Sequence, residues 1–241
     1  MSLILAAVTA ASLALLRYIG MGVKTRGKAQ RQLILASGDG DLALVEVLVG
    51  QGVNPNTNAQ TPGYVAGVTP LLAAAHGGRE HVAQFLLSLP NINLEAGSEA
   101  GWTALLVASH YGHLSIVKML LDRGANPNAA TNKGNTPLME AAAEGRQDVA
   151  QVLLSLPNIK LEARSERGGT ALVFAASWGH LNLVKLLLDH GAEPAVVVNS
   201  GRTVLDLVAW HMIRWGRQGD WEKRDRIREV LRHLVVEVGC P

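Results

Sequence analysis

Cysteine is almost missing from this chain of 241 residues, which contains only one, Cys240. A single cysteine can form neither an internal disulfide nor a cysteine-rich zinc site, and small secreted domains usually depend on such cross-links. Pro241 follows it directly, which excludes a C-terminal prenylation motif. The cysteine content therefore favours a reducing compartment, and we expect a cytoplasmic protein.

Aromatic residues and net charge are also scarce. Aromatic residues make up 4% of the chain and hydrophobic residues 48%, so the apolar part is mainly Leu, Ala and Val. Such a composition suits thin pairs of helices better than a globular core. The formal net charge of +2 is too small to indicate nucleic acid as the partner, and we expect none.

What the sequence does contain is a repeat. The triplet Gly-x-Thr begins at positions 67, 101, 134, 168 and 201, in steps of 34, 33, 34 and 33 residues. In the unit 101–128, the threonine opens a short apolar helix, Gly112-His113 forms a turn, and a second helix ends at Gly124 before an extended hairpin. Two short helices cannot bury their aliphatic side chains alone, so such units must stack on one another.

These motifs resemble the ankyrin repeat. Thr-Pro-Leu at 69–71 and 136–138 matches the family's opening, and Gly-His at 112–113 and 179–180 matches its turn, which excludes a tetratricopeptide array of similar period. Arg79 and Arg146 replace the turn histidine, and we expect each replacement to weaken one capping interaction. The resemblance extends from about residue 29 to the C-terminus. It implies an all-α ankyrin-repeat solenoid of about six helix-turn-helix-hairpin repeats with terminal caps.

Alternate repeats differ at the end of their second helix. Repeats two and four share the sequence Ser-Leu-Pro-Asn-Ile, and their prolines, Pro90 and Pro157, stand where the other repeats have glycine. Proline lacks an N–H and disfavours helical geometry in the residue before it. We therefore expect these second helices to end at Leu89 and Leu156.

We divide the chain into four parts. Residues 1–28 form a hydrophobic N-terminal segment with a basic flank, and 29–66 form a degenerate first repeat with an extended loop, in which Pro62-Gly63 predicts a protruding finger. Residues 67–200 hold repeats two to five. Residues 201–241 form a degenerate sixth repeat and a basic C-terminal cap. Its charged helix is interpreted as a solvated face rather than as a site for acidic groups.

The N-terminal segment is unusually apolar. Between Leu3 and Val23 the only charged residue is Arg17, and four basic residues follow before the first acidic one. Three interpretations stay open: a membrane anchor of about the required 20 residues with the repeats in the cytosol, an N-terminal capping helix, or a signal peptide that lacks a clear cleavage site. We prefer the anchor, because only Thr9 and Ser12 offer the polar outer face of a cap.

Motifs for catalysis are missing. The sequence has no P-loop, dinucleotide-binding glycine motif, H-E-x-x-H or nucleophile elbow. Ser115 and Lys118 form an S-x-x-K pattern, but the matching serine position two repeats later is Asn182, which indicates a variable surface position. The histidines of the expected outer helices lack a cysteine or carboxylate at ligand spacing. We predict no enzyme activity, no cofactor and no metal site.

Binding of a protein partner is the better hypothesis. The resemblance implies that partners contact the hairpin tips and the two residues before the turn, which line the concave face. Trp and Tyr are the commonest anchors of protein interfaces, and four of the chain's few aromatic residues occupy these positions. The alternative is that they only pack along the neighbouring repeat. The predicted partner-binding residues are Trp102, His110, Tyr111, Lys133, Asn135, Glu144, Arg167, Ser177, Trp178, Arg202, Trp210 and His211.

The sequence thus predicts a monomeric, non-catalytic interaction module that binds a protein on its concave face. The preferred form is tethered to a membrane by residues 3–23. The alternative is a soluble adaptor or regulatory subunit whose N-terminal segment is a capping helix.

Overall fold

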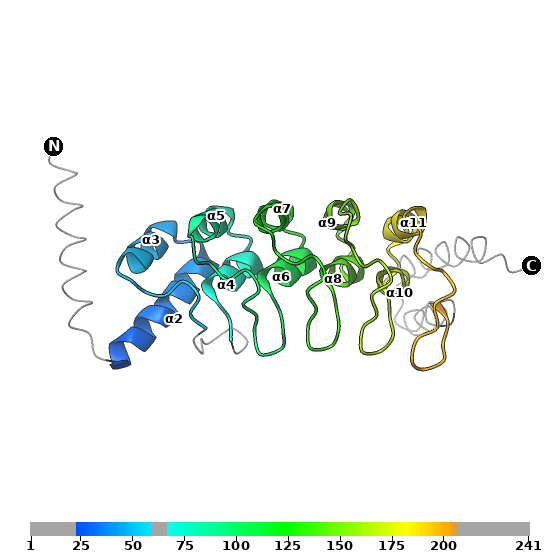
Figure 1. The fold of residues 1–241 in the computed structure, drawn as a ribbon, viewed down its shortest axis with the longest axis horizontal. Coiled ribbons are helices and arrows are strands. Elements are labelled where there is room, and N and C mark those ends of the chain that lie inside the picture. Colours follow the sequence, from blue (N-terminus) through cyan, green and yellow to red (C-terminus); the bar gives the residue numbers. More distant parts are fainter. Residues whose placement is uncertain (1–22, 59–66, 205, 207–241) are drawn as a thin grey trace, which may run out of the picture. The chain divides into compact units, whose positions relative to one another are not determined.

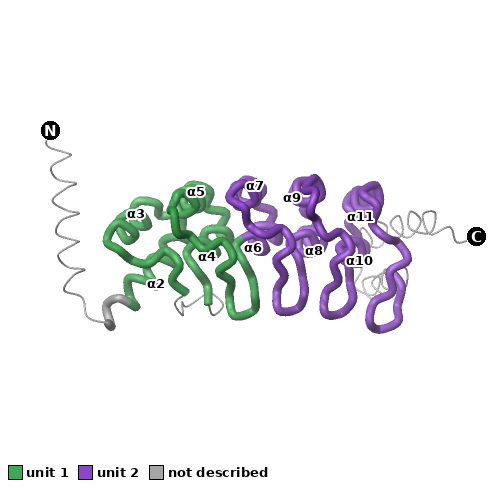
Figure 2. Tube along the Cα trace, in the orientation of Figure 1, with its two compact units in different colours: residues 1–104 green, residues 105–241 purple. Residues whose placement is uncertain are grey.

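The structure, a computed structural model, describes residues 23–58, 67–204 and 206 (Figure 1). Within these residues the chain forms ten α-helices and no β-strand, apart from one isolated bridge between Val197 and Thr203. The chain divides into two compact units, residues 1–104 and 105–241 (Figure 2). The fold class is therefore all-α, and each unit is described by itself below.

The first unit contains two pairs of helices. In the first pair, α2 (Val23–Asp39) packs against α3 (Leu42–Gly50), and in the second α4 (Pro70–Gly77) packs against α5 (Glu80–Ser88). α2 also packs on α4, and α3 on α5, so the pairs stack with like helices side by side. This is the arrangement expected of stacked repeats.

Helix α2 is longer than the first helix of the other repeats. It has 17 residues, and the predicted domain boundary between residues 28 and 29 falls inside it. Arg31, which takes the position of the usual threonine cap, lies within the helix. A cap is not required there, because the backbone N–H groups around Arg31 already have helical partners one turn earlier.

The second unit repeats the same plan three times. The inner helices form one row, and the outer helices, which follow the turns, form a second row (Figure 1). Hairpins join each outer helix to the next inner helix. The inner helices are α6 (Ala104–Tyr111), α8 (Pro137–Ala143) and α10 (Ala171–Ser177), and the outer helices are α7 (Leu114–Asp122), α9 (Gln147–Leu154) and α11 (Leu181–Asp189).

Threonine caps begin α4 and α8 as the motif predicts. The hydroxyl of Thr69 accepts a hydrogen bond from Leu72 N at 3.3 Å, and that of Thr136 accepts one from Met139 N at 3.4 Å. A proline occupies the first helical position after both, where its missing N–H costs nothing. The buried hydroxyl of Thr170, which alanine follows, has no hydrogen-bond partner.

The ends of the outer helices differ slightly from the prediction. Gly124 ends α7 with φ +86°, as expected of a C-terminal glycine. The helices before the prolines end earlier than predicted, α5 at Ser88 and α9 at Leu154. Leu89 is already extended, with ψ 136°, because it precedes Pro90. In α9 the last turn tightens, and Leu156 N donates to Leu153 O at 3.2 Å.

Buried aliphatic residues hold the repeats together. In the second unit the largest fully buried side chains come from both rows, and among them are Leu105, Ile116, Leu138, Leu153 and Leu172. Small residues fill the rest of the inner row, where five alanines are 0% exposed: Ala108, Ala141, Ala142, Ala175 and Ala176. Close packing of thin helices therefore uses the Leu and Ala content that replaces aromatic residues in this chain.

Candidate functional site

One surface position recurs directly before each turn glycine of the second unit. It is occupied by Tyr111, Glu144 and Trp178, and we call these three residues the turn column. Tyr111 is 41% exposed and Trp178 49% exposed, although both are large and apolar. The side chain of Glu144 is 41% exposed. Each residue is held in place by the inner helix that precedes it and the glycine that follows it.

The turn glycines are required by close contacts as well as by their backbone. Gly112 has φ +81° and Gly145 has φ +69°, a region that side chains with a Cβ rarely adopt. A Cβ at Gly112 would lie 2.8 Å from Cδ of Arg146, and one at Gly145 would lie 2.7 Å from the His180 ring. The residue after the turn in one repeat therefore packs across the turn of the repeat before it.

That residue also binds the end of the preceding inner helix. Arg146 Nε donates to His110 O at 3.0 Å, and His180 Nε2 lies 3.0 Å from Ala143 O. In the first unit Arg79 Nε donates to Gly38 O at 2.8 Å. The last carbonyls of a helix lack partners within the helix. The expectation that arginine weakens the interaction of the turn histidine is wrong, because the guanidinium reaches the equivalent carbonyl.

The hairpin tips are held by a hydroxyl group that the sequence analysis missed. Ser98 Oγ accepts a hydrogen bond from Trp102 N at 3.3 Å, and Thr131 Oγ1 accepts one from Asn135 N at 3.2 Å. Ser165 Oγ does the same for Gly169 N at 3.1 Å. A serine or threonine six residues before the start of the next inner helix is the signal that could have revealed these contacts.

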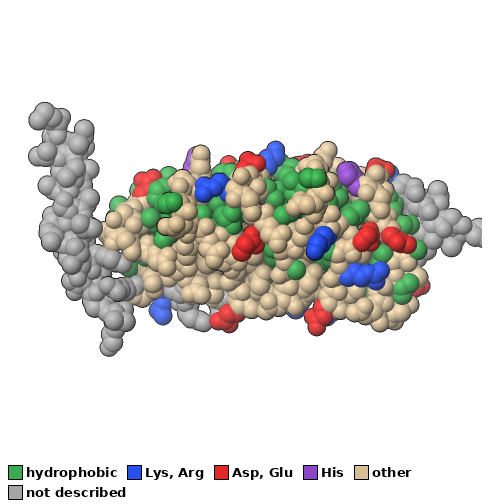
Figure 3. Space-filling view, viewed as in Figure 1, with side chains coloured by type: hydrophobic (Ala, Val, Ile, Leu, Met, Phe, Trp, Pro, Cys, Tyr) green, Lys and Arg blue, Asp and Glu red, His purple; other side chains and the backbone are tan. Residues whose placement is uncertain are grey.

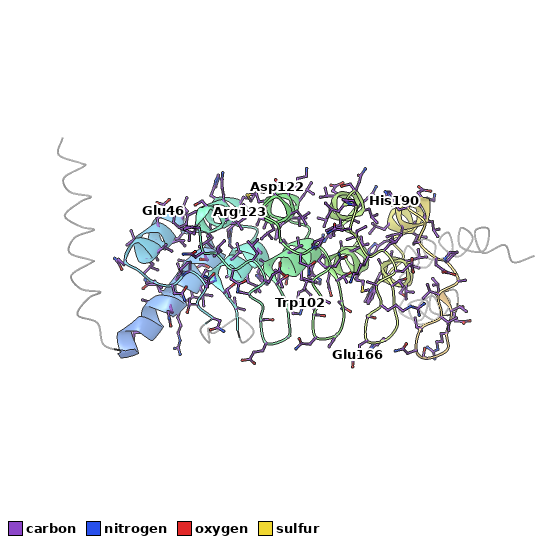
Figure 4. All side chains as sticks on the ribbon, viewed as in Figure 1. Glu46, Trp102, Asp122, Arg123, Glu166 and His190 are labelled. Atoms are coloured by element: carbon purple, nitrogen blue, oxygen red, sulfur yellow. The ribbon has the colours of Figure 1, made fainter. Side chains whose placement is uncertain are left out.

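Neighbouring hairpins are also tied to each other. Asn128 Nδ2 donates to Asn158 O at 2.9 Å, and its Oδ1 accepts from Lys160 N at 2.8 Å. Asn199 Nδ2 donates to Glu166 O at 2.7 Å. Glu166 lies at the tip of its hairpin, whereas Asp122, Arg123 and His190 lie on the side of the outer helices (Figure 4). The Asn128 bonds join the starts of neighbouring hairpins and the Asn199 bond joins their tips, so the hairpins stay in register from one repeat to the next.

A polar cluster joins repeats three and four beside the turn column. His110 Nδ1 lies 3.1 Å from Glu140 Oε2, and Asn135 Nδ2 donates to Glu140 Oε1 at 2.8 Å. Glu144 Oε1 lies 3.9 Å from the same His110 nitrogen. The hydrogen bond to Glu140 raises the pKa of His110, burial opposes this rise, and the Glu144 carboxylate adds to it.

Glu140 is the functional candidate that sequence reasoning missed. It is 6% exposed and occupies an inner-helix position that holds Val107 in repeat three and Phe174 in repeat five. A buried carboxylate is costly unless hydrogen bonds satisfy it. Asn135 and His110, which were predicted to contact a partner, supply those bonds. A glutamate within an otherwise apolar column was the available signal.

A groove lies beside Trp178. Its volume is about 930 Å³, and it is bounded by α10 and by the hairpins on either side of it. Its lining includes the buried Val173 and the half-buried Phe174, and also the exposed polar residues Arg167 and Ser200. The structure thus brings together three predicted site residues at this groove, which are Arg167, Ser177 and Trp178.

The remaining predicted residues are placed separately. Trp102 is half-buried in the first unit, and Lys133 and Arg202 are exposed in hairpins of the second unit. Trp210 and His211 lie outside the described residues, as do the loop finger and the charged C-terminal helix. At the C-terminal boundary of the description, Thr203 and Asp206 form a capping box, in which Asp206 Oδ2 accepts from Thr203 N at 2.8 Å.

The described part of the chain holds neither a metal-binding cluster nor a helix that could span a membrane. Among the described residues no three His, Cys, Asp or Glu side chains are grouped so that they could hold a metal ion. No helix in this part of the chain has the length and apolar character needed to cross a membrane, and residues 3–22 of the predicted anchor lie outside it. On the face of the second unit shown in Figure 3, acidic and basic side chains are interspersed.

Comparisons with known proteins agree with the repeat geometry. The family model of ankyrin repeats (3 copies) matches residues 33–131 and 96–165, and that of ankyrin repeats (many copies) matches 172–211. The chain is 38% identical over 100 residues to protein fem-1 homolog A-like of Mus musculus, which covers 40% of this chain and 14% of that protein. It is 30% identical over 133 residues to ankyrin repeat and SAM domain-containing protein 6 of Danio rerio, and this match covers 55% of this chain and 18% of that protein.

A third similar protein is neurogenic locus notch homolog protein 1 of Danio rerio, 30% identical over 158 residues, with 59% of this chain and 6% of that protein covered. The chain therefore spans less than a fifth of the length of each of these relatives. Ankyrin repeats form protein–protein interaction modules that are typically non-catalytic. The first family model covers more than half of the residues of this chain, and the chain therefore belongs to the ankyrin repeat proteins.

Proposed function

We propose that this protein is a non-catalytic adaptor that binds a protein partner through the turn column and the hairpin tips of its second unit. The observation that carries this proposal is the exposure of Tyr111 and Trp178, at 41% and 49%. Neither side chain is needed to cover the core of its own repeat, because the leucines and alanines of α6 and α10 already fill it.

Chemistry at this surface supports a protein partner. Large aromatic side chains surrounded by polar and charged residues are typical of interface anchors with a polar rim. Here Trp178 stands beside Arg167, Asn199 and Ser200 at the groove. The hairpin bonds that hold these residues in register reduce the ordering cost of binding.

Affinity capture from cells that express the full chain tests the proposal. Trp178→Ala and Tyr111→Ala should each weaken capture of the bound protein by about 2 kcal/mol, or roughly 30-fold. Val47→Ala is the matched control, since Val47 is 50% exposed on the outer helix α3. Equal capture by all four proteins would contradict a binding role for the turn column.

We further propose that the N-terminal segment anchors the repeats to a membrane with the repeats in the cytosol. The argument is the apolar run from Leu3 to Leu16 and the basic residues after Val23. A stretch of about 20 apolar residues suffices to span a bilayer, and basic residues stay on the cytosolic side.

Alkaline carbonate extraction of membranes tests the anchor. A chain lacking residues 1–22 keeps α2 whole, because that helix begins at Val23. If the segment is an anchor, the full chain stays in the pellet and the shortened chain becomes soluble and folded. A soluble full chain together with a shortened chain that aggregates would instead indicate a soluble adaptor with an N-terminal cap.

A further inference from the structure

We propose that the partner segment bound by the turn column carries a basic side chain, Lys or Arg, between two apolar side chains. This inference rests on the proposed function and adds the chemistry of the partner. It follows from the order of residues in the column, where an acid, Glu144, stands between two exposed aromatics, Tyr111 and Trp178.

The three residues belong to consecutive repeats that contact each other directly. Arg146, two residues after Glu144, binds the carbonyl of His110 beside Tyr111. His180, two residues after Trp178, contacts the carbonyl of Ala143 beside Glu144. Equivalent contacts thus connect each pair of neighbouring repeats, and the three side chains occupy the same position in their repeats.

Glu144 retains capacity to accept hydrogen bonds. A carboxylate has about four acceptor positions. Its Oε1 lies 3.9 Å from His110 Nδ1, and the same nitrogen lies only 3.1 Å from Oε2 of the other carboxylate, Glu140. Glu140, by contrast, has one oxygen bound by Asn135 and the other by His110, and it is 6% exposed. Glu144 is therefore the member of the cluster that a partner can reach.

Local charge favours a cation. Around His110 two carboxylates, Glu140 and Glu144, face one guanidinium, Arg146, whose Nε is occupied by a backbone carbonyl. When His110 is neutral, this part of the column is negatively charged. Covering Glu144 with an apolar or acidic segment would leave a desolvated carboxylate without a donor, which is costly. Lys or Arg supplies the donor, and it also interacts favourably with a flanking aromatic ring.

Spacing predicts where the apolar side chains lie. Packed helices are about 8–10 Å apart, so Tyr111 and Trp178, two repeats apart, are separated by roughly 20 Å. A chain in the polyproline II conformation covers this distance in about six residues, since it rises about 3.1 Å per residue, and its period of three residues places side chains i, i+3 and i+6 on one face. The basic residue therefore lies about three residues from each apolar one. The apolar residue near Trp178 enters the groove of about 930 Å³ over Val173 and Phe174.

Synthetic heptapeptides test this inference with the full chain. Each peptide has Leu at both ends, Ala at the other flanking positions, and Arg, Lys, Gln, Leu or Glu in the centre. Fluorescence polarisation should show the Arg and Lys peptides binding about tenfold more tightly than the Gln and Leu peptides, with the Glu peptide weakest. Glu144→Gln should remove the preference, and Glu144→Lys should reverse it. Asp122→Lys, an equal charge change on the exposed end of α7, should leave the order unchanged.

Other outcomes overturn the inference. Equal binding of all central residues, a preference for Glu, or no binding of any peptide at millimolar concentration would each do so. The capture experiment tests the proposed function separately from the basic partner chemistry. If Trp178→Ala weakens capture of the cellular partner while Glu144→Lys does not, the turn column binds protein and only the basic partner chemistry is wrong.

Discussion

Helices α8 and α10 occupy equivalent places in repeats four and five, but their side chains differ at two positions. Each has seven residues, and each buries an equivalent leucine, Leu138 in one and Leu172 in the other, to 1% exposure. At the two positions four and eight residues after the capping threonine, repeat four has Glu140 and Glu144, whereas repeat five has Phe174 and Trp178.

The comparison separates two groups of positions. Leucine, alanine and the capping threonine recur because every repeat must pack on its neighbours. The exposed position of Glu144 and Trp178 changes from carboxylate to aromatic without any change in the helix, so folding does not determine it, whereas Glu140 depends on its hydrogen bonds to Asn135 and His110. Where folding leaves a position open and its side chain is large and exposed, binding is the better explanation.

The largest effect is expected at the shared positions. Leu138→Ala and Leu172→Ala should each lower the free energy of unfolding by about 3 kcal/mol, because both remove a fully buried side chain and leave a cavity. Chemical denaturation followed by circular dichroism measures both values. A clearly smaller loss at one of them would mean that the two helices are not equivalent in packing.

Two glycines with positive φ, Gly145 in the turn and Gly191 after α11, should show the next largest effect. Gly191→Ala should cost about 1–2 kcal/mol, since its φ of +85° is unfavourable but nothing lies within 4 Å of the new Cβ. Gly145→Ala should cost about 1 kcal/mol more, because the new Cβ displaces the His180 ring and its bond to Ala143. Thermal unfolding of both variants gives the difference. Equal losses would show that the contact across the turn contributes nothing.

Exchanging the chemistry of the two helices tests why Glu140 is tolerated. Phe174→Glu should destabilise the protein by about 2 kcal/mol. Asn135 and His110 bind Glu140 in repeat four, but the equivalent residues near position 174 are Gly169 and Ala143, whose side chains cannot donate hydrogen bonds. Phe174→Gln is the control without charge and should cost less. Stability of Phe174→Glu equal to wild type in urea titrations would show that the bonds to Glu140 are unnecessary.

A smaller effect concerns pH. The pKa of His110 is raised in the folded state, mainly by its hydrogen bond to Glu140, so its contribution to stability is complete below the ordinary histidine pKa of 6.5 and is lost as pH rises through the raised value. Wild type should therefore exceed His110→Gln in unfolding free energy more at pH 5.5 than at pH 8.5. Because His110 is partly exposed, the change should stay under about 1 kcal/mol.

Glu140→Gln supplies the control for this pH effect, since the amide removes the charge of the acceptor. The difference in unfolding free energy between Glu140→Gln and the Glu140→Gln/His110→Gln double mutant should change less with pH than the difference between wild type and His110→Gln. A difference between wild type and His110→Gln that is the same at both pH values would contradict the assignment.

Much of the fold was accessible from sequence because its signals are local. The threonine caps, the glycines with positive φ and the apolar spacing each act within about ten residues, and the comparisons confirmed the family they indicated. The helix before each proline ended one or two residues early, since a tight last turn depends on backbone details. The predicted boundary between residues 28 and 29 lies inside α2, which begins at Val23, because residues 24–31 are mostly polar and carry no apolar spacing that predicts a helix.

The candidate site was only partly accessible from sequence. Positional comparison identified Tyr111, Glu144 and Trp178, and these remain predicted contacts. It did not identify the cluster around Glu140, because His110 and Glu140 are 30 residues apart in the chain and meet only when α6 packs beside α8. For the same reason, Asn135 and His110 were assigned to a partner although they bind Glu140.

The sequence by itself determined the repeat and the helix boundaries near their caps, since these follow from spacing and local backbone preferences. Only the tertiary structure showed that Arg146 binds the carbonyl equivalent to the one that His180 contacts, that Glu140 is hydrogen-bonded, and that Glu144 is exposed. Each of these depends on distances between side chains and carbonyls of different repeats, and stacking alone brings those groups together.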